Sequence, residues 1–449
     1  MARRRTTPER AAGRGTPERR ADGAAAIVRR APFSDNPEVG IRGQRTQQRI
    51  LDAALRVFAE DGYHAASIDR IARVAGCSRV SFYQYFASKE DVFGHLAAQL
   101  ARQVTASIEA LDPLTPDRDG WTAMRSWVTR YAEIDARYEP VFHAYQAVVE
   151  SDAGVAVAVA QTGEETVARV RSRFVTTTLP PRQLDPVIRM LLQCLNHTFD
   201  VVGILRSVAP DAYPDERVEV AITDVLHRTL FGLRADVNAH AAMGTPSPPL
   251  EFGPEMLGLL QDGEVMEPSD NATLSALLDA GRTVFAERGY HGARVDDVVN
   301  VAGVSHGAFY RYFPNKDALA RILNAHALRA IGTTVMDLPD TSRDSDAAAR
   351  TALRRWLRRF NRAQSDEAAM LRVWVDAALQ DPALRAESAP PLDWGRRRMS
   401  RYLGPRGFGD PDMDAVVMVA LLGVFGGRRR SAPEVEAAAH VIERGLLGR

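Results

Sequence analysis

Lysine is almost absent from this sequence of 449 residues. Lys89 and Lys316 are its two lysines, and all the other residues among its 57 basic side chains are arginine. Each lysine is the ninth residue of a ten-residue stretch, SFYQYFASKE (81–90) in one case and AFYRYFPNKD (308–317) in the other. The scarcity of lysine therefore draws attention to two similar segments that lie 227 residues apart (316 − 89 = 227).

Cysteines and long apolar runs are also scarce. The two cysteines, Cys77 and Cys194, are too distant in sequence to suggest a disulfide framework or a metal cluster, so we expect small buried thiols in a reducing, cytoplasmic compartment. The longest apolar run, Ala415 to Gly427, is shorter than the roughly 20 residues of a membrane-spanning helix and indicates a buried helix. The basic N-terminal residues are not followed by the apolar stretch of a signal peptide. We therefore expect no membrane association.

Neither net charge nor a catalytic motif points to a function. Acidic and basic residues balance at 57 each, so any attraction to nucleic acid has to come from a local patch. The sequence has no nucleophile motif, no Walker loop and no dinucleotide-binding motif, and His143, His197 and His227 are isolated from cysteine or carboxylate clusters at ligand spacing. We expect no enzyme, no cofactor and no metal site.

The chain contains an internal duplication. The offset of 227 also pairs Gly62-Tyr63-His64 with Gly289-Tyr290-His291, without a gap. An offset of 229 (356 − 127) pairs Trp127 with Trp356, and VLHRTLFG (225–232) resembles VIERGLLG (441–448). The duplication therefore extends over a whole unit, a head and a body. The predicted division is an arm (1–43), head 1 (44–96), body 1 (97–235), a linker (236–270), head 2 (271–323) and body 2 (324–449).

The arm and the linker lack the apolar periodicity of folded segments. The arm is rich in arginine, which is compatible either with a merely solvated tail or with a segment that binds a DNA groove or backbone. The linker is rich in proline and acidic residues, with a possible short helix at 254–261.

Elsewhere the periodicity predicts an all-α protein. In the first copy, Ile50, Leu51, Ala54, Val57 and Phe58 follow helical spacing, and this helix is predicted to stop at Gly62. Serine or asparagine is predicted to cap the later helices of the heads; these residues are Ser67, Ser78, Ser88 and Asn315.

Two short helices joined by a turn at Gly76 are typical of a helix-turn-helix, whose second helix enters a DNA major groove. Phe82 and Phe86 are one turn apart and are expected to face inward. The side chains expected on the exposed or rim side are Arg79, Ser81, Tyr83, Gln84 and Tyr85. The alternative, a hydrophobic hinge that packs helices without DNA, is disfavoured by the turn, the caps and the repeat.

The segments GYHAASIDRIARVAGCSRVSFYQYFASKEDVF and GYHGARVDDVVNVAGVSHGAFYRYFPNKDAL resemble the DNA-binding heads of the tetracycline-repressor family. The resemblance implies phosphate contacts by a recognition-helix tyrosine and by the lysine that opens the fourth helix. The implied phosphate or backbone contacts in the two copies are Tyr83, Tyr85, Lys89, Tyr310, Tyr312 and Lys316, with Ser67 at the second helix. Base reading would fall to Arg79, Ser81 and Gln84 in head 1 and to His306 and Arg311 in head 2.

Head 2 departs from this pattern. Arg294 stands where head 1 has the capping Ser67, and Asp296 and Asp297 open its second helix, which is unfavourable beside phosphate. Gly307 and Ala308 leave its recognition helix fewer side chains for reading bases. DNA contact is therefore expected more firmly from head 1.

The bodies match the resembled family in helical character alone. Their aromatic residues are typical of a core, although the resemblance implies that some of them line a ligand cavity. The candidate ligand-binding residues are Trp127, Tyr131, His143, Tyr145, Trp356 and Trp374. The resemblance also implies a dimer interface made of a four-helix bundle, here between the helices around 190–205 and 225–232 and those around 415–427 and 441–448.

These observations lead to the hypothesis of a tandem transcription regulator folded as an intramolecular pseudo-dimer. Its expected partners are double-stranded DNA, at a non-palindromic operator, and a small-molecule effector that releases repression. One alternative is a small-molecule sensor with one or both heads inactive in DNA binding, which acts through a protein partner. Another is an intermolecular homodimer with four heads.

Overall fold

The structure is a computed structural model that describes residues 40–151, 153–238, 249–250, 271–339, 346–380, 382–404, 408–426 and 429–449. Within these ranges every regular element is helical, apart from an isolated bridge between Leu114 and Phe174. The all-α prediction is therefore confirmed. None of the described helices is long and apolar enough to cross a membrane.

The first unit forms a head of three helices followed by a helical body. The head comprises α1 (Ile41–Ala65), α2 (Ile68–Val74) and α3 (Arg79–Tyr85). The body comprises α4 (Lys89–Glu109), α5 (Arg118–Ser151), α6 (Ala153–Arg171), α7 (Pro181–Arg206), η2 (Pro210–Ala212), α8 (Asp215–Phe231) and α9 (Ala235–Asn238).

The second unit repeats this order. Its head comprises α11 (Ala272–Gly292), α12 (Val295–Ala302) and α13 (His306–Tyr312). Its body comprises α14 (Lys316–Met336), α15 (Asp346–Asp366), α16 (Ala368–Gln380), α17 (Pro382–Leu403), α18 (Pro411–Gly423), α19 (Ala432–His440) and the π-helix η3 (Val441–Leu446).

The element ends refine the predicted boundaries. Helix α1 begins at Ile41, within the segment assigned to the arm, and α9 extends to Asn238, within the segment assigned to the linker. The possible helix at 254–261 lies outside the described residues. Gly62 has a positive φ of 73°, so the chain bends there although helical bonding resumes after it, as predicted for a helix end.

Each head has a core of its own, and the two bodies share one. Phe58, Phe82 and Phe86 are buried in head 1, and Phe285, Phe309 and Phe313 are buried in head 2. A single hydrophobic cluster runs from body 1 through α7 and α8 into α18, α19 and η3 of body 2. Residues 415–423 of the apolar run lie in the buried helix α18, as predicted.

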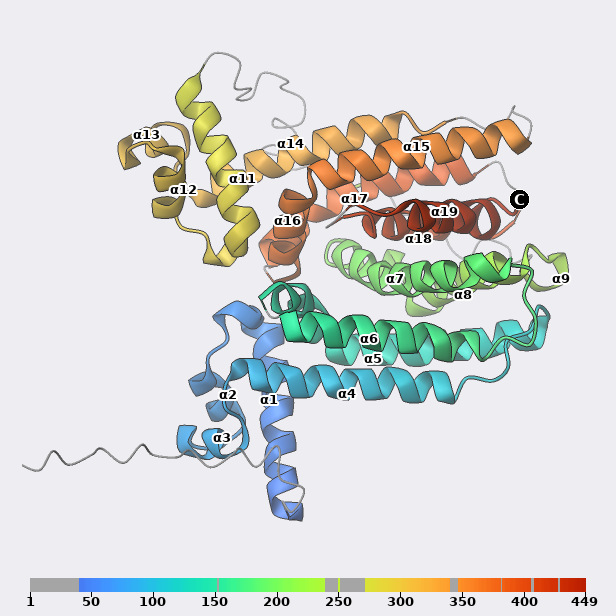
Figure 1. Ribbon diagram of the computed structural model, residues 1–449, viewed down its shortest axis with the longest axis horizontal. Helices are drawn as coiled ribbons and strands as arrows, with labels where there is room; N and C mark the ends of the chain where they lie inside the picture. Colours follow the sequence, from blue (N-terminus) through green and yellow to red (C-terminus); the bar gives the residue numbers. More distant parts are fainter. Residues whose placement is uncertain are drawn as a thin grey trace, which may run out of the picture.

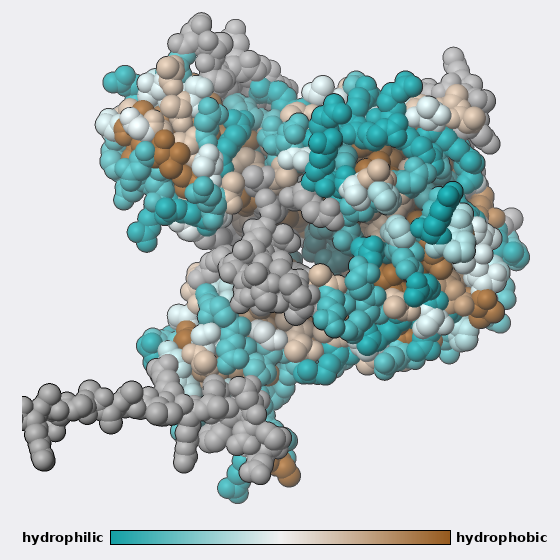
Figure 2. Space-filling model, in the orientation of Figure 1, coloured by the Kyte–Doolittle hydropathy of each residue, from teal (hydrophilic) through white to brown (hydrophobic). Residues whose placement is uncertain are grey.

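The shared core determines how the units are placed. Helices α7 and α8 lie against α18 and α19 in the middle of the molecule, and the two heads lie on the same side of it (Figure 1). The space-filling view shows the heads as separate lobes on that side (Figure 2). Cys194 of α7 is buried, with its Sγ 3.6 Å from the Val417 carbonyl of α18, whereas Cys77 of head 1 is only half-buried. The prediction of a buried thiol therefore holds fully for Cys194 alone.

Candidate nucleic-acid interface

Head 1 has the helix-turn-helix geometry because local signals start and stop its helices. The Ser67 hydroxyl accepts a hydrogen bond from Arg70 N (3.3 Å), and the Ser78 hydroxyl accepts one from Ser81 N (3.0 Å). Between α2 and α3, Gly76 has a φ of 65°, a conformation that L side chains rarely adopt. The caps and the glycine thus set the sharp turn that separates α2 from α3.

The faces of α3 divide as predicted. Phe82 and Phe86 are fully buried, and their rings lie 5.9 Å apart. Gln84 is exposed, whereas Ser81, Tyr83 and Tyr85 are half-buried at the rim. The side chain of Val80 is 73% exposed at the front of this helix. Burial of the two phenylalanines anchors a seven-residue helix that could not be stable alone.

Arg79 begins α3 and is held by two neighbours. Its Nη1 lies 3.1 Å from each carboxylate oxygen of Asp69 on α2, and its Nη2 donates to the Tyr83 hydroxyl at 3.4 Å. Both Arg79 and Asp69 are largely exposed, so this pair contributes little stability. It orients the guanidinium on the outer face of the head, where a base or phosphate could replace the carboxylate.

Head 2 places different side chains at the same positions. His306 occupies the position of Arg79, with its Nε2 3.4 Å from Asp296. Arg311 is exposed, and Tyr310 is 56% exposed. Tyr312 is half-buried, and its hydroxyl accepts a hydrogen bond from Asn271 Nδ2 at 2.7 Å. The outer face of head 2 therefore presents imidazole and phenol groups where head 1 presents a guanidinium.

The second helix of head 2 is capped in another way. Asp297 accepts a hydrogen bond from Arg294 N at 3.2 Å, so a carboxylate in the first turn substitutes for the missing serine. Asp297 also pairs with Arg288 at 2.8 Å. One of the two acidic residues that seemed unfavourable beside phosphate is thus occupied inside the head.

The two lysines make the same contact in both heads. Lys89 Nζ donates to the Tyr63 carbonyl at 2.7 Å and lies 4.4 Å from the centre of the Tyr63 ring. Lys316 Nζ donates to the Tyr290 carbonyl at 2.8 Å and to the Ala293 carbonyl at 3.1 Å. Burial lowers the pKa of both ammonium groups from the ordinary value of lysine. The lysines thus join the end of the first head helix to the start of the fourth helix.

Sequence reasoning did not identify three of these partners. Asp69 and Asp296 were not assigned roles with Arg79 and His306, and the carbonyl group of Tyr63 was not recognised as a lysine acceptor. The repeat contains a signal for the first two, because Asp69 and Asp296 are also related by the offset of 227 (296 − 69). The acceptors depend on how the helices cross, which no local pattern shows.

The comparisons with known proteins bear on both heads. The model of "Bacterial regulatory proteins, tetR family" matches twice, at residues 50–96 and 277–322. The chain belongs to the tetR family. The two matches coincide with the two heads, so this member of the tetR family has two tandem units.

Several of the relatives share the name AcnR. The HTH-type transcriptional repressor AcnR of Corynebacterium diphtheriae is 30% identical over 127 residues, which cover 26% of this chain and 65% of the relative. AcnR of Corynebacterium glutamicum is 31% identical over 113 residues, or 23% of this chain and 58% of the relative. The HTH-type transcriptional regulator AcrR of Shigella flexneri is 42% identical over 53 residues, which cover 12% of this chain and 25% of the relative. The chain thus aligns with less than two thirds of the length of each of these three tetR-family relatives.

Behind the heads, body 1 contains a small apolar cavity of about 30 Å³. It is lined by twelve residues from the segment that follows α4 to α8, among them Trp127, Met124 and Leu195. The Trp127 indole donates to the Ser107 hydroxyl at 3.3 Å, which satisfies the one polar atom of this side chain. Trp127 is therefore the candidate ligand residue that the structure places at this cavity.

Tyr131 and His143 lie in a polar cluster between α5 and α7. The Tyr131 hydroxyl donates to Asn196 at 3.4 Å, and both His143 and His197 approach Asp200, at 3.6 and 3.4 Å. No cluster at ligand spacing marks these histidines in the sequence, but the fold brings His143 of α5 close to Asp200 of α7, three residues after His197 on the same helix. Among the described residues, no group of three or more histidine, cysteine, aspartate or glutamate side chains could hold a metal ion.

The same cluster contains Asp135, whose pKa is raised to about 8 by burial and by the neighbouring carboxylates Asp200 and Glu139. Burial also favours protonation of Asp200, but hydrogen bonds from His143 and His197 lower its pKa well below the ordinary value. At neutral pH the cluster thus contains one protonated and one ionised aspartate.

His143 also lines a second cavity, of about 100 Å³, at the junction of head 1 and both bodies. Its other walls include Phe58 and Tyr63 of α1, Glu139 of α5 and Arg385 of α17. This cavity therefore borders α1, the first helix of head 1.

The remaining ligand candidates are elsewhere. Trp356 is buried in the shared core, donates to the Thr334 carbonyl at 2.8 Å and stacks on Phe360. Trp374 donates to the Ser388 hydroxyl at 2.9 Å in a small separate cluster beside head 2. The side chain of Tyr145 lies outside the described residues. The structure therefore does not bring the six candidates into one cavity.

Proposed function

We propose that the chain is a DNA-binding transcription regulator whose two heads read different halves of one operator. The observation that carries this proposal is that the two heads share their internal packing but present different side chains on their outer faces. The buried phenylalanines, the turn glycines and the lysine contacts recur, whereas Arg79 is replaced by His306 and Gln84 by Arg311. Symmetric dimers of such heads bind half-sites about 34 Å apart on a palindrome. Unlike heads favour an operator that is not palindromic.

A single chain is proposed to suffice for binding, because the packing of α7 and α8 on α18, α19 and η3 holds both heads on one side of the molecule (Figure 1). The proposed outcome is repression by occupancy of the operator, in line with the relatives named AcnR, which are described as repressors.

A small molecule is proposed to release this repression from body 1. The apolar cavity beside Trp127 favours an apolar effector, and because it is small the surrounding leucines must move when the effector enters. Coupling between such a site and the DNA contact is typically about 1–3 kcal/mol, or roughly 5- to 150-fold in DNA affinity.

Selection of bound sequences from random DNA tests the operator. The expected result is a bipartite site with unlike halves, bound by one chain as measured by mass in solution. Arg79→Ala should relax the preference at one or two base pairs of a single half, with a loss of about 1–3 kcal/mol in discrimination. Arg311→Ala is the matched variant and should affect only the other half. A palindromic selected site, or an unchanged preference in Arg79→Ala, contradicts the proposal.

A second candidate function follows from head 2. Gly307 and Ala308 have no side-chain groups that could hydrogen-bond to bases, and His306 of the same recognition helix is paired with Asp296. In this version the chain is a small-molecule sensor in which one or both heads do not bind DNA, and it acts through a protein partner. Gel-shift measurements with and without cell extract distinguish the two, since a shift that requires extract supports the sensor.

A further inference from the structure

We infer that the bundle faces of the two units are built to accept each other and to reject a second copy of unit 1. Here unit 1 means residues 40–238, and unit 2 means the described residues from 271 to 449. This inference rests on the single-chain arrangement proposed above, but not on DNA binding. It concerns two features of the contact between α8 and the helices of body 2, one electrostatic and one steric.

The electrostatic feature is a buried guanidinium of unit 1 that is satisfied by unit 2. The side chain of Arg228 is fully buried, with Nη2 3.0 Å from Asp414 of α18 and Nε 2.7 Å from the Gly445 carbonyl of η3. Its third partner, Asp224, lies one turn earlier on α8, at 3.4 Å. Removal of one member of such a buried pair is strongly destabilising, because the remaining charge has no compensation.

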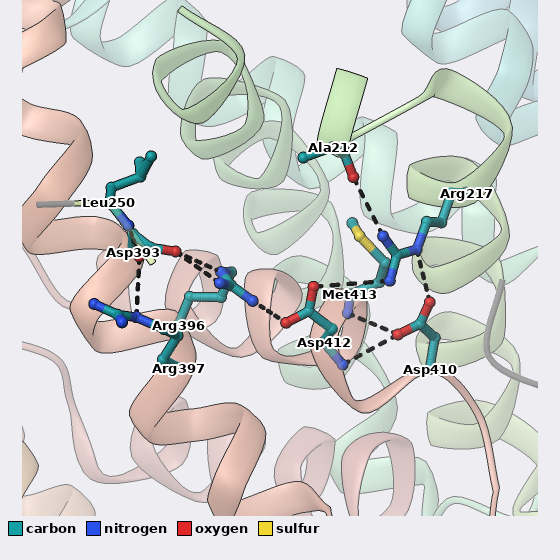
Figure 3. A network of polar contacts seen from close by, with 9 residues as sticks. All are labelled: Ala212, Arg217, Leu250, Asp393, Arg396, Arg397, Asp410, Asp412 and Met413. Atoms are coloured by element: carbon teal, nitrogen blue, oxygen red, sulfur yellow. Dashed lines mark hydrogen bonds and ion pairs between the residues drawn. The ribbon is translucent and has the colours of Figure 1, made fainter. Parts of the chain in front are cut away.

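A second arginine of α8 extends this pattern toward the other end of the bundle. Arg217 Nε donates to Asp410 at 2.8 Å, and its Nη2 lies 3.7 Å from Asp412 (Figure 3). Asp412 also pairs with Arg396 of α17, which in turn contacts Asp393 at 2.7 Å. In the pairs that join the two units, unit 1 therefore contributes the arginines, and the N-terminal part of α18 with its capping Asp410 contributes the aspartates.

The internal repeat shows what a second copy of unit 1 would offer instead. The motif Asp-Pro opens both α18, at 410–411, and the matching part of α7, at 185–186, which gives an offset of 225 (410 − 185). Asp414 then corresponds to Arg189, which here pairs with Glu164 on the outside of body 1 at 2.7 Å. In a pair of two unit 1 copies, the position that faces Arg228 would therefore carry an arginine, and Arg228 would have no carboxylate there from the other copy.

The steric feature lies where the two units cross. Thr229 and Gly445 are related by the repeat, with an offset of 216 (445 − 229), and they touch each other. A Cβ atom at Gly445 would lie 2.3 Å from Thr229 Oγ1 and 2.9 Å from the Val225 carbonyl oxygen. A copy of unit 1 carries threonine at this position, so the two copies would clash at their crossing point.

Not all charges in the bodies follow this pattern. Arg125 pairs with Glu219 inside unit 1, and Arg354, its counterpart at the offset of 229 (354 − 125), pairs with Glu436 and Glu443 inside unit 2. This pair inside the unit thus recurs after duplication, whereas the pair of Arg228 with Asp414 between the units does not. This contrast is expected if the contact between the units selects unlike faces.

Re-pairing of the units after cleavage tests the inference. A protease site is inserted between residues 238 and 249 of the full chain, and the folded protein is cut there. The cut protein is then unfolded in urea and refolded, and the masses of the resulting pairs are measured by native mass spectrometry. The expected product is the unlike pair, with the mass of the intact 49.3 kDa chain plus the insert, in excess of unit 1 pairs by about 100-fold or more. Comparable amounts of unit 1 pairs would overturn the inference.

Matched variants of the cut protein show which residues are responsible. Arg228→Met with Asp414→Met and Thr229→Gly should raise the share of unit 1 pairs at least about tenfold, because repulsion and clash are both removed. Arg125→Met with Glu219→Met removes an ion pair within unit 1 and should leave the ratio unchanged. An equal change in both sets of variants would contradict the inference.

The uncut chain gives a second measurement that does not depend on refolding of separate units. Gly445→Thr should lower the urea midpoint, whereas Thr229→Gly combined with Gly445→Thr should recover part of the loss, because the contact with Thr229 is removed while the Val225 carbonyl oxygen stays close. No loss in the single variant, or no recovery in the exchange, would count against the inference. Neither experiment involves DNA, so a failure here leaves the operator proposal standing, and a failure of operator binding leaves this inference standing.

Discussion

Lys89 of head 1 and Lys316 of head 2 make the same contact, but the side chains that begin their recognition helices differ. Each lysine donates to a carbonyl group at the end of the first helix, at 2.7 and 2.8 Å. In contrast, a guanidinium held by Asp69 in head 1 is replaced by an imidazole near Asp296 in head 2. Contacts that hold a head together were kept after duplication, whereas the outer face, which no internal contact constrains to the same extent, diverged.

The bodies differ in a similar way. Body 1 has the polar cluster around Asp135 and Asp200, whose counterparts in body 2 are Gln364 (offset 229) and Phe425 (offset 225). Phe425 is fully buried, and its ring lies 6.1 Å from that of Phe360, so aromatic packing replaces the carboxylates. Body 1 is thus the better candidate for a regulated site, and body 2 for a rigid support.

The largest expected difference between the heads comes from their buried phenylalanines. Phe82→Ala and Phe309→Ala each remove a fully buried ring, which costs about 3–5 kcal/mol and should unfold the head concerned. If head 1 carries most of the DNA affinity, Phe82→Ala abolishes the gel shift, whereas Phe309→Ala weakens it and shortens the protected DNA. Equal losses would instead show that both heads bind with similar strength.

The next largest expected difference between the bodies is the pH dependence of their folding stability. The pKa of Asp135 is about 8 in the folded chain and about 4 in an unfolded one, so the folded state binds more protons between these values and stability falls as pH rises from 4 to 8. Asp135→Gln, which copies body 2, removes this loss. We expect the variant to gain about 3 kcal/mol on the wild type between pH 5.5 and pH 8.5 in urea unfolding.

The neighbouring charges provide the control for this pH effect. Asp200, Glu139 and His143 face Asp135, and Glu139→Gln changes an outer member of the cluster. Because Glu139 is the smallest of the causes that raise the pKa of Asp135, this variant should keep the fall in stability with pH but end it at a slightly lower pH. Parallel profiles for Asp135→Gln and the wild type would show that the carboxyl group is ionised in the folded protein.

The lysines provide a smaller and sharper comparison. Lys89→Met removes a hydrogen bond to one carbonyl group and Lys316→Met removes hydrogen bonds to two, with a loss of about 1 kcal/mol in unfolding free energy for each bond. If an ammonium group also contacts phosphate, the slope of log affinity against log salt falls by about one unit. We expect this change for Lys89→Met and a smaller one for Lys316→Met. Lys89→Arg keeps the charge and should preserve the slope; an unchanged slope in Lys89→Met would assign the lysine a structural role alone.

The parts of the molecule that the sequence predicts well depend on neighbours along the chain. Ser67, Ser78, Ser88 and Asn315 cap helices as predicted, since a cap needs only the next three residues. The inward direction of Phe82 follows in the same way from helical spacing.

Predictions fail where distant helices meet. The contact of Lys89 with the Tyr63 carbonyl and the approach of His143 to Asp200 depend on crossing angles that no periodicity encodes. The scatter of the six candidate ligand residues has the same cause, because aromatic spacing on one helix does not show which neighbour covers it. The internal repeat indicates such a contact only where both units retain an equivalent pair of residues.

The smallest predicted effect concerns Gly307 in the recognition helix of head 2. Its counterpart in head 1 is Val80 (offset 227), and a Cβ atom there would have Ser305 Oγ, at 3.8 Å, as its nearest neighbour. Gly307→Ala should therefore stabilise head 2 by about 0.5–1 kcal/mol, measured by hydrogen exchange of its amides. Gly303→Ala is the control and should destabilise, since Gly303 has a φ of 66°. If Gly307→Ala also raises DNA affinity, the weaker DNA contact predicted for head 2 arises from the glycine in its recognition helix; if affinity stays the same, it arises from the side chains expected to face the DNA.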